Sequence, residues 1–196
     1  MDDGGLVSRA RSGDFHAAEQ LLARHQNIAY TAALRLLGEK ADAEDVTQDA
    51  LVKAYTRLGE LQDGASFPAW LRRIAVNLSL NALRRRGLLR FEPLEGTQAA
   101  TDGERPARDF IDAQQRTPEE EALSTALRDE IESLVRQLPA EQRVAVVLRD
   151  MYGYDVAEVA ELQRCGLSAA KMRITRGRAH LRRLLTGVRV EAPVEA

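Results

Sequence analysis

Apolar residues recur along most of the chain at the three- and four-residue spacing of an amphipathic α-helix, and no stretch alternates strictly in the manner of a half-buried strand. Capping signals divide this pattern, because Asp, Thr or Ser at the start of a segment and Gly at its end mark helix boundaries. One predicted helix ends at Gly38, and two others begin at the caps Asp42 and Thr117. Further helices are predicted from Phe67 to Leu83, from Asp155 to Leu162 and from Ser168 to about Leu185. The pattern therefore predicts an all-α fold.

The helical pattern stops between Phe91 and Thr117, where Pro, Gly and Thr replace the large apolar residues. Such a stretch buries too little surface to offset the entropy of ordering it, so we expect a flexible linker over 91–117. The linker would join two small helical domains at 1–90 and 118–187, the second followed by a tail at 188–196.

Composition agrees with this organisation. The 196 residues are 44% hydrophobic but only 5% aromatic, which favours helices packed on helices. No apolar run approaches the roughly 20 residues that span a bilayer, and the single Cys cannot form an internal disulfide. The first residues lack the basic-then-apolar order of a signal peptide. We therefore expect a cytoplasmic protein with no membrane insertion.

Positive and negative side chains are segregated along the chain, although the net charge is only −2. All charged side chains between Leu71 and Leu89 are basic, and so are all those between Arg164 and Val190, whereas acids collect at 39–49 and 119–132. Two acid-free basic stretches predict two contacts with a polyanion; the alternative is that each is a solvated helix face.

The C-terminal region has the pattern of a helix-turn-helix. A short helix from Asp155 to Leu162 is followed by a break at 164–166 and then by a basic helix from Ser168. In such a motif the second helix enters the major groove of DNA, while the alternative for a basic amphipathic helix is docking on a membrane surface or an acidic partner. The side chains expected to contact DNA are Ser168, Ala169, Lys171, Met172, Arg173 and Arg176.

Catalysis finds little support in the sequence. The three His residues are scattered, and neither a Gly-rich phosphate loop nor a zinc-spaced Cys/His cluster is present. We expect no enzymatic activity, no cofactor and no metal site.

Three segments together carry a family resemblance. They are DAEDVTQDA at 42–50, FPAWLRRIAVN at 67–77, and LPAEQR at 138–143 followed by the stretch 153–185. In this order the chain resembles the extracytoplasmic-function (ECF) sigma factors, which are promoter-recognition subunits of bacterial RNA polymerase. The resemblance covers nearly the whole chain except the linker and both ends. It implies core polymerase (the clamp of the largest subunit and the flap) and promoter DNA as partners, and an anti-sigma factor as a third.

In that family the acidic segment docks on the clamp helices of the polymerase. The resemblance assigns this role to Glu44, Asp45, Gln48 and Asp49. Val46 and Tyr55 would hold the segment to its own domain. A divalent-metal site and a plain solvated face are the alternatives, although consecutive helical positions diverge instead of converging on one ion.

The segment from Phe67 to Arg86 resembles the helix that melts the promoter −10 element and holds a flipped base beside its start. The resemblance implies −10 contacts from Phe67, Arg72, Arg73, Asn77, Arg84, Arg85 and Arg86. Trp70 fits a core anchor, with a stacking platform for a base as the alternative. The −35 element would be read by the helix-turn-helix.

The turn departs from the family pattern, because Gln163-Arg164 stands where a Leu-Gly pair is usual and Gly166 where Pro is common. Arg adopts the left-handed conformation less readily than Gly, so either the turn is reshaped or Gly166 provides the bend. Cys165 fits a small apolar filler, with a redox sensor as the alternative. A stand-alone helix-turn-helix regulator is the competing function, but it leaves 42–49 and 67–86 without a role.

Overall fold

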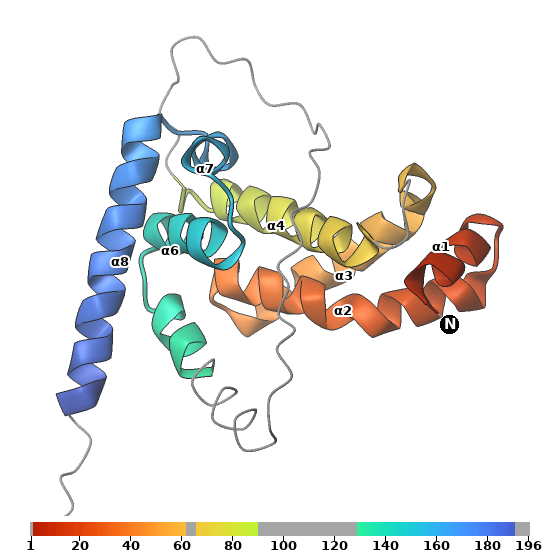
Figure 1. Ribbon diagram of the computed structural model, residues 1–196, viewed down its shortest axis with the longest axis horizontal. Helices are drawn as coiled ribbons and strands as arrows, with labels where there is room; N and C mark the ends of the chain where they lie inside the picture. Colours follow the sequence, from red (N-terminus) through yellow and green to blue (C-terminus); the bar gives the residue numbers. More distant parts are fainter. Residues whose placement is uncertain (1, 62–65, 90–128, 191–196) are drawn as a thin grey trace, which may run out of the picture. The chain divides into compact units, whose positions relative to one another are not determined.

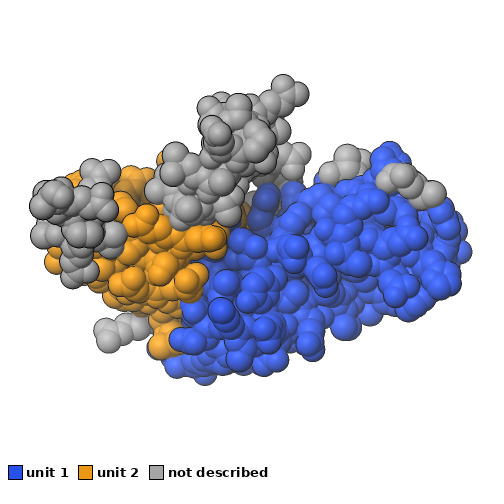
Figure 2. All heavy atoms as spheres, turned by 90° about the horizontal axis from the view of Figure 1, so that it is seen from below, with its two compact units in different colours: residues 1–87, 101–109 blue, residues 88–100, 110–196 orange. Residues whose placement is uncertain are grey.

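The computed structural model describes residues 2–61, 66–89 and 129–190, and every regular element in these ranges is a helix (Figure 1). The all-α prediction is therefore confirmed. The chain divides into two compact helical units, which Figure 2 colours separately, as the sequence predicted. The predicted linker, the predicted helix start at Thr117 and the chain beyond residue 190 lie outside the described residues, so the domain boundaries stay predictions. None of the helices in the described ranges combines the length and apolar character that crossing a bilayer requires.

In the first unit, α2 is the central helix and contacts α1, α3 and α4. The elements of this unit are α1 (Asp3–Arg11), α2 (Phe15–Leu37), α3 (Lys40–Thr56), the short 3-10 helix η1 (Leu58–Glu60) and α4 (Phe67–Arg85). Alanines line much of the core: Ala29, Ala32 and Ala33 on α2 and Ala43 and Ala50 on α3 are fully buried. Side chains this small let the helix backbones approach closely, and larger Leu residues fill the remaining space.

Capping chemistry fixes both ends of α2. The Asp14 side chain accepts a hydrogen bond from the Ala17 N–H (3.1 Å), and Gly38 closes the helix in the left-handed conformation at φ 85°. The predicted helix end at Gly38 is confirmed.

One prediction for α3 is wrong. The helix begins at Lys40 with Glu39 at its N-cap, so Asp42 lies inside the first turn, where its carboxylate bonds to Arg86 instead of capping the helix. Val46 is buried, as expected of a residue that holds α3 to the domain, whereas Tyr55 is 47% exposed and contacts α2 through the edge of the Phe15 ring.

Helix α1 was not predicted. It has two glycines in its first turn and few apolar positions, of which Leu6 and Val7 are buried, so its hydrophobic pattern is weak. One local signal was available: Asp2 caps the helix by accepting a hydrogen bond from the Gly5 N–H.

The second unit packs α8 against α6 and α7. Its elements are a helical stretch at 129–136, α6 (Ala140–Val146), the π-helical turn η3 (Val147–Met151), α7 (Val156–Gln163) and α8 (Leu167–Val190). Val144, Leu148 and Val159 form its buried centre. The predicted start of this helix at Asp155 is confirmed: Asp155 caps α7 in a capping box, in which the Glu158 N–H donates to the Asp155 side chain and the Asp155 N–H donates to the Glu158 side chain.

The turn between α7 and α8 depends on an unusual backbone conformation at Arg164. Arg164 adopts the left-handed conformation (φ 51°, ψ 52°), and the Cys165 N–H donates to the Ala160 carbonyl at 2.9 Å, which closes the helix as in a Schellman motif. Gly166 has no positive φ, so the alternative in which Gly166 provides the bend is wrong. A non-glycine residue in this conformation costs about 1–2 kcal/mol.

Close approach of α8 to α6 depends on Gly177. A Cβ at this position would lie 2.6 Å from the Val146 Cγ2 and 3.2 Å from the Gln142 carbonyl oxygen. The helix itself begins at Leu167, one residue before the predicted start at Ser168, and extends past Leu185.

Substituting Gly177→Ala is expected to destabilise the second unit by about 1–3 kcal/mol, because overpacking outweighs the roughly 1 kcal/mol that Ala gains in helix propensity. Amide hydrogen exchange of α6–α8 in the full-length protein measures the change. The matched control is Gly166→Ala, whose Cβ would meet nothing within 4 Å. Equal protection in both variants would contradict the close contact.

Arg164→Gly is expected to stabilise the second unit by about 0.5–1 kcal/mol, because Gly adopts the left-handed conformation without the Cβ penalty. Arg164→Ala removes the long side chain but retains the penalty, so it should give no such gain. Calorimetric unfolding of the two variants separates backbone relief from the loss of the guanidinium, and a gain in the Ala variant would refute this assignment.

Candidate nucleic-acid and protein interfaces

Helix α3 presents an acidic face to solvent. Its exposed positions follow helical spacing, while Ala43, Val46 and Ala50 between them are buried. The exposed side chains include all four residues that the sequence assigned to polymerase docking, Glu44, Asp45, Gln48 and Asp49. Positions in the described part of the chain form no group of three or more His, Cys, Asp or Glu able to hold a metal ion.

An apolar extension of this face was missed. Val52 is 65% exposed, Tyr55 three residues later is also exposed, and the Tyr55 ring makes an edge-to-face contact at 6.2 Å with exposed Phe15 of α2. Val52 stands four residues after Gln48, so helical spacing alone could have placed it on the acidic face. An exposed apolar group beside carboxylates suits a protein partner better than a plain solvated surface.

Arg86 is engaged within its own unit. It forms a two-pronged ion pair with Asp42, including a 2.6 Å bond from Nη2 to Oδ1, and so joins the end of α4 to the start of α3. The hydrogen bond from Arg86 lowers the pKa of Asp42 below its ordinary value, and the same bond raises the pKa of Arg86. The Arg86 side chain is 50% exposed, so its assignment as a phosphate contact stays a prediction, in which phosphate would compete with Asp42 for the guanidinium.

The assignment of Phe67 as a contact of the −10 element is wrong. It is fully buried at the first position of α4, between the rings of His25 (5.6 Å between centroids) and Trp70 (5.9 Å). A side chain with no accessible surface cannot contact DNA in this fold, so Phe67 is a core residue that fixes the helix start. Trp70 is buried beside it, which confirms the core-anchor prediction.

The remaining polar residues of α4 reach its surface. Arg72, Arg73 and Asn77 are half-buried and Arg85 is exposed, whereas Arg84 donates to the Asn81 side chain at 2.6 Å. Asn81 is an exposed residue that sequence reasoning missed, although it follows Asn77 by one helical turn. The five residues Arg72, Arg73, Asn77, Arg84 and Arg85 thus remain candidates for nucleic-acid contact.

The first turns of α8 also present a polar outer face. Ser168, Lys171, Met172 and Arg176 are exposed as predicted, while Ala169 is half-buried. Two further exposed side chains, Leu167 and Thr175, lie at adjoining helical positions and were missed. This face combines small, apolar and cationic groups, which is the mixture that base-edge contacts require.

Arg173, predicted to contact DNA, instead lies on the inner face of α8 and is 7% exposed. Its Nη2 donates to the Glu141 carboxylate (3.0 Å) and its Nη1 to the Gln163 side chain (3.2 Å). Gln163 Nε2 donates in turn to the Glu141 backbone carbonyl at 2.8 Å. Arg173 is therefore corrected to a structural residue, because these bonds tie α8 to α6 and to the end of α7.

The same network explains two departures from the family pattern. Gln163 is buried with its amide satisfied at both ends, so a polar residue is accommodated where Leu is usual. Cys165 is fully buried with its sulfur 3.9 Å from the Gln163 Oε1, a placement that favours the filler interpretation over a redox sensor.

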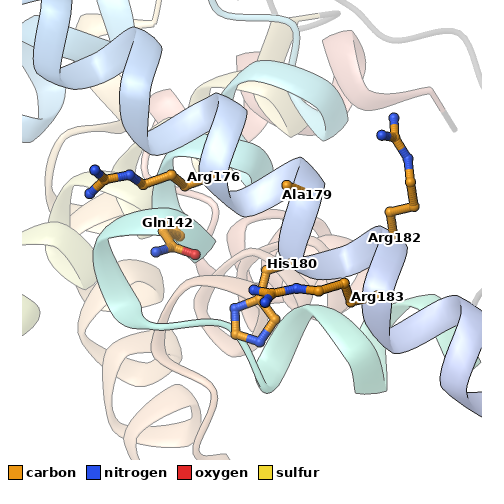
Figure 3. A pocket seen from close by; sticks show the side chains of 6 residues that line it. All are labelled: Gln142, Arg176, Ala179, His180, Arg182 and Arg183. Carbon is orange, nitrogen blue, oxygen red and sulfur yellow. The ribbon is translucent and has the colours of Figure 1, made fainter.

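A positively charged pocket of 570 Å³ opens between α6 and α8. Gln142 comes from α6 and the other lining residues from α8: Arg176, Ala179, His180, Arg182 and Arg183 (Figure 3). None of these six is acidic. Arg178, by contrast, pairs with Asp150, and that hydrogen bond raises the pKa of Arg178. The pocket extends the cationic surface of α8 beyond Arg176.

Substituting Arg173→Ala is expected to lower the free energy of unfolding of the second unit by about 1.5–3 kcal/mol, because Glu141 and Gln163 both lose a charged hydrogen-bond donor. Chemical denaturation followed by circular dichroism measures the loss. The matched control is Arg176→Ala, which deletes an exposed guanidinium of the same helix and should cost less than about 0.5 kcal/mol. Equal losses in the two variants would contradict the structural role of Arg173.

Comparison with known proteins agrees with the two helical units. Residues 21–88 match the sequence model of Sigma-70 region 2, and residues 128–181 match that of Sigma-70, region 4. The RNA polymerase sigma-H factor of Pseudomonas aeruginosa is 32% identical over 195 residues, which cover 97% of each chain. The ECF RNA polymerase sigma factor SigM of Mycobacterium tuberculosis is 33% identical over 192 residues, covering 96% of this chain and 89% of SigM.

Among solved structures, that of CnrH in complex with the cytosolic domain of CnrY is similar. It is 26% identical, covers 94% of this chain and 97% of its own, and superposes with a TM-score of 0.50. The chain thus contains both family regions in the expected order, and it has relatives above 30% identity over nearly its whole length. Both findings agree with the geometry described above. The chain belongs to the extracytoplasmic-function sigma factors, the subunits that bind RNA polymerase and direct it to begin transcription at particular promoters.

Proposed function

We propose that the first unit docks on core polymerase through the acidic face of α3 and holds the promoter −10 element with α4, while the second unit reads the −35 element with α8. One observation carries this division of labour. On each of these three helices the residues with suitable chemistry are exposed or half-buried, while the opposite face builds the core. The docking residues are Glu44, Asp45, Gln48 and Asp49, against the clamp helices of the largest subunit.

The −10 contacts follow from the polar residues that α4 leaves accessible. Arg72, Arg73 and Arg85 would hold phosphates of the non-template strand, and Asn77 would hydrogen-bond an unstacked base. Capture of a flipped base recovers about 1–3 kcal/mol, similar to the cost of opening a base-pair step. On this proposal binding energy shifts the DNA toward the melted state, and the chain performs no catalytic step and needs no cofactor.

The −35 contacts follow from the outer face of α8. Ser168 and Ala169 are small, so the start of the helix can approach the floor of the major groove. Lys171 and Arg176 can donate to guanine edges or phosphates, and exposed Met172 suits a thymine methyl group. Further along the helix, the pocket residues Arg182 and Arg183 would add sequence-independent attraction to the DNA backbone.

The partner set extends this proposal. CnrH is bound to the cytosolic domain of CnrY in its solved structure, and by analogy this chain would be held inactive in the cytoplasm by an anti-sigma protein. Such a partner would act by covering the exposed faces of α3 and α8. The polymerase flap is the expected contact of the second unit.

A stand-alone helix-turn-helix regulator is the alternative for the second unit. It gives no role to the acidic face of α3, whose charges and exposed apolar extension are unneeded for binding duplex DNA. Dependence on core polymerase separates the two proposals, because a stand-alone regulator binds its site without it.

Transcription from genomic DNA tests the proposal directly. Core polymerase supplemented with the purified protein is expected to start transcripts at particular positions, and sequencing of their 5′ ends then gives the promoter. If the supplemented enzyme initiates no more selectively than core polymerase alone, the proposed function is wrong.

Replacing Asp45→Arg together with Asp49→Arg is expected to weaken core binding at least tenfold with both units still folded, because two positive side chains would replace two carboxylates of the acidic docking surface. Titration of core polymerase with labelled protein measures the affinity. Asp45→Arg alone should show an intermediate loss, and its matched control is Glu19→Arg, an exposed acid on α2. Undiminished binding of the double variant would remove α3 from the interface.

A further inference from the structure

Helix α1 lies before the sequence that matches Sigma-70 region 2, which begins at residue 21, yet it is firmly attached to the first unit. Leu6 and Val7 anchor it through buried side chains. Two polar residues near its opposite ends, Asp3 and Arg11, make further contacts that lead toward α4.

The first contact begins at Asp3. One carboxylate oxygen accepts from Arg24 at 2.8 Å, and the other lies 2.8 Å from the His25 Nε2, with the side chains of Asp3 and His25 mostly buried. The ring of His25 packs in turn against Phe67, the first residue of α4. Asp3 therefore fixes the ring against which α4 begins.

The second contact begins at Arg11. Its Nη1 donates to the backbone carbonyl of Leu61 at 3.3 Å, across fifty positions of sequence. Leu61 directly follows η1 and is itself buried. Helix α1 is thus tied to Leu61 by one end and, through His25, to Phe67 by the other.

We propose that α1 is a positioning element for the start of α4, acting through Arg11 on Leu61 and through Asp3 and His25 on Phe67. It rests on the proposed role of α4 at the −10 element. Burial of Phe67 and Trp70 keeps α4 in the core. Loss of the polar contacts of α1 therefore lets the first turn of α4 shift its position instead of unfolding the unit. Because recognition of a base depends on placement to a fraction of an ångström, loosening the helix start reduces selectivity more than overall affinity.

The closest matched pair of variants is Arg11→Ala and Arg9→Ala. Both remove one guanidinium from the last turn of α1, but Arg9 pairs with Asp14 at the start of α2, whereas Arg11 donates to the Leu61 carbonyl. Asp3→Asn tests the other end with an isosteric change, and Arg11→Lys is the conservative rescue because it keeps a cationic donor.

Each variant is assembled into holoenzyme with core polymerase, after thermal unfolding has shown that it folds. The probes are a labelled non-template oligonucleotide carrying the mapped −10 sequence and the same strand with one −10 base replaced. Arg11→Ala and Asp3→Asn are expected to reduce the ratio of the two affinities at least threefold, with core affinity unchanged, while Arg9→Ala and Arg11→Lys keep the wild-type ratio.

A wild-type ratio in both Arg11→Ala and Asp3→Asn would overturn the inference, and so would an equal reduction in Arg9→Ala. These results differ from failure of the proposed function, in which the wild-type holoenzyme itself would not distinguish the two strands. If Arg11→Ala does not fold, Asp3→Asn alone decides the outcome by the same ratio.

Discussion

Burial of one face of each helix is the constraint on which the rest of this structure depends. On α3 the buried face is a row of Ala and Val residues that packs on α2, and the carboxylates follow on the opposite face. The same division places Ile174 of α8 inside and Lys171 and Arg176 outside. Because helix period fixes which residues share a face, the core and the interfaces are specified by the same residue spacing.

Polar and charged residues that bond to one another across helices of a unit join these helices, whereas those on the outer faces are candidates for contact with partners. Arg173, Gln163 and Glu141 connect three helices of the second unit, and Asp42 and Arg86 connect two helices of the first. Arg173 and Gln163 are buried, and buried polar groups must be satisfied, since a lone member would lose its hydrogen bonds to water without replacement. The orientation of α8 relative to α6 therefore depends on a polar network as well as on the close approach at Gly177.

Local chemistry made much of the fold predictable. The end of α2 at Gly38, the capping box at Asp155 and the extent of α4 each depend on interactions within a few residues, and the sequence shows these directly. Helix α1 escaped prediction because its stability comes from Leu6 and Val7 packing on the unit and from side chains that contact α2. Arg164 escaped because its left-handed conformation is one that its own preference disfavours, and it lies between Gln163 and Cys165, which are both buried.

By itself the sequence determined the all-α class, the two-unit organisation, the family, and the acidic and basic stretches from which interface residues are drawn. It could not determine which charges are available, because sign and spacing say nothing about partners distant in the chain. Arg86 meets Asp42 across 44 positions and Arg173 meets Glu141 across 32, so two cations from acid-free stretches are paired once the helices pack. Phe67 likewise changes from a candidate DNA contact to a core residue when His25 covers its ring. Only the tertiary structure separates Phe67 and Arg173 from Lys171, Met172 and Arg176, because exposure is a property of how helices pack and not of any one segment.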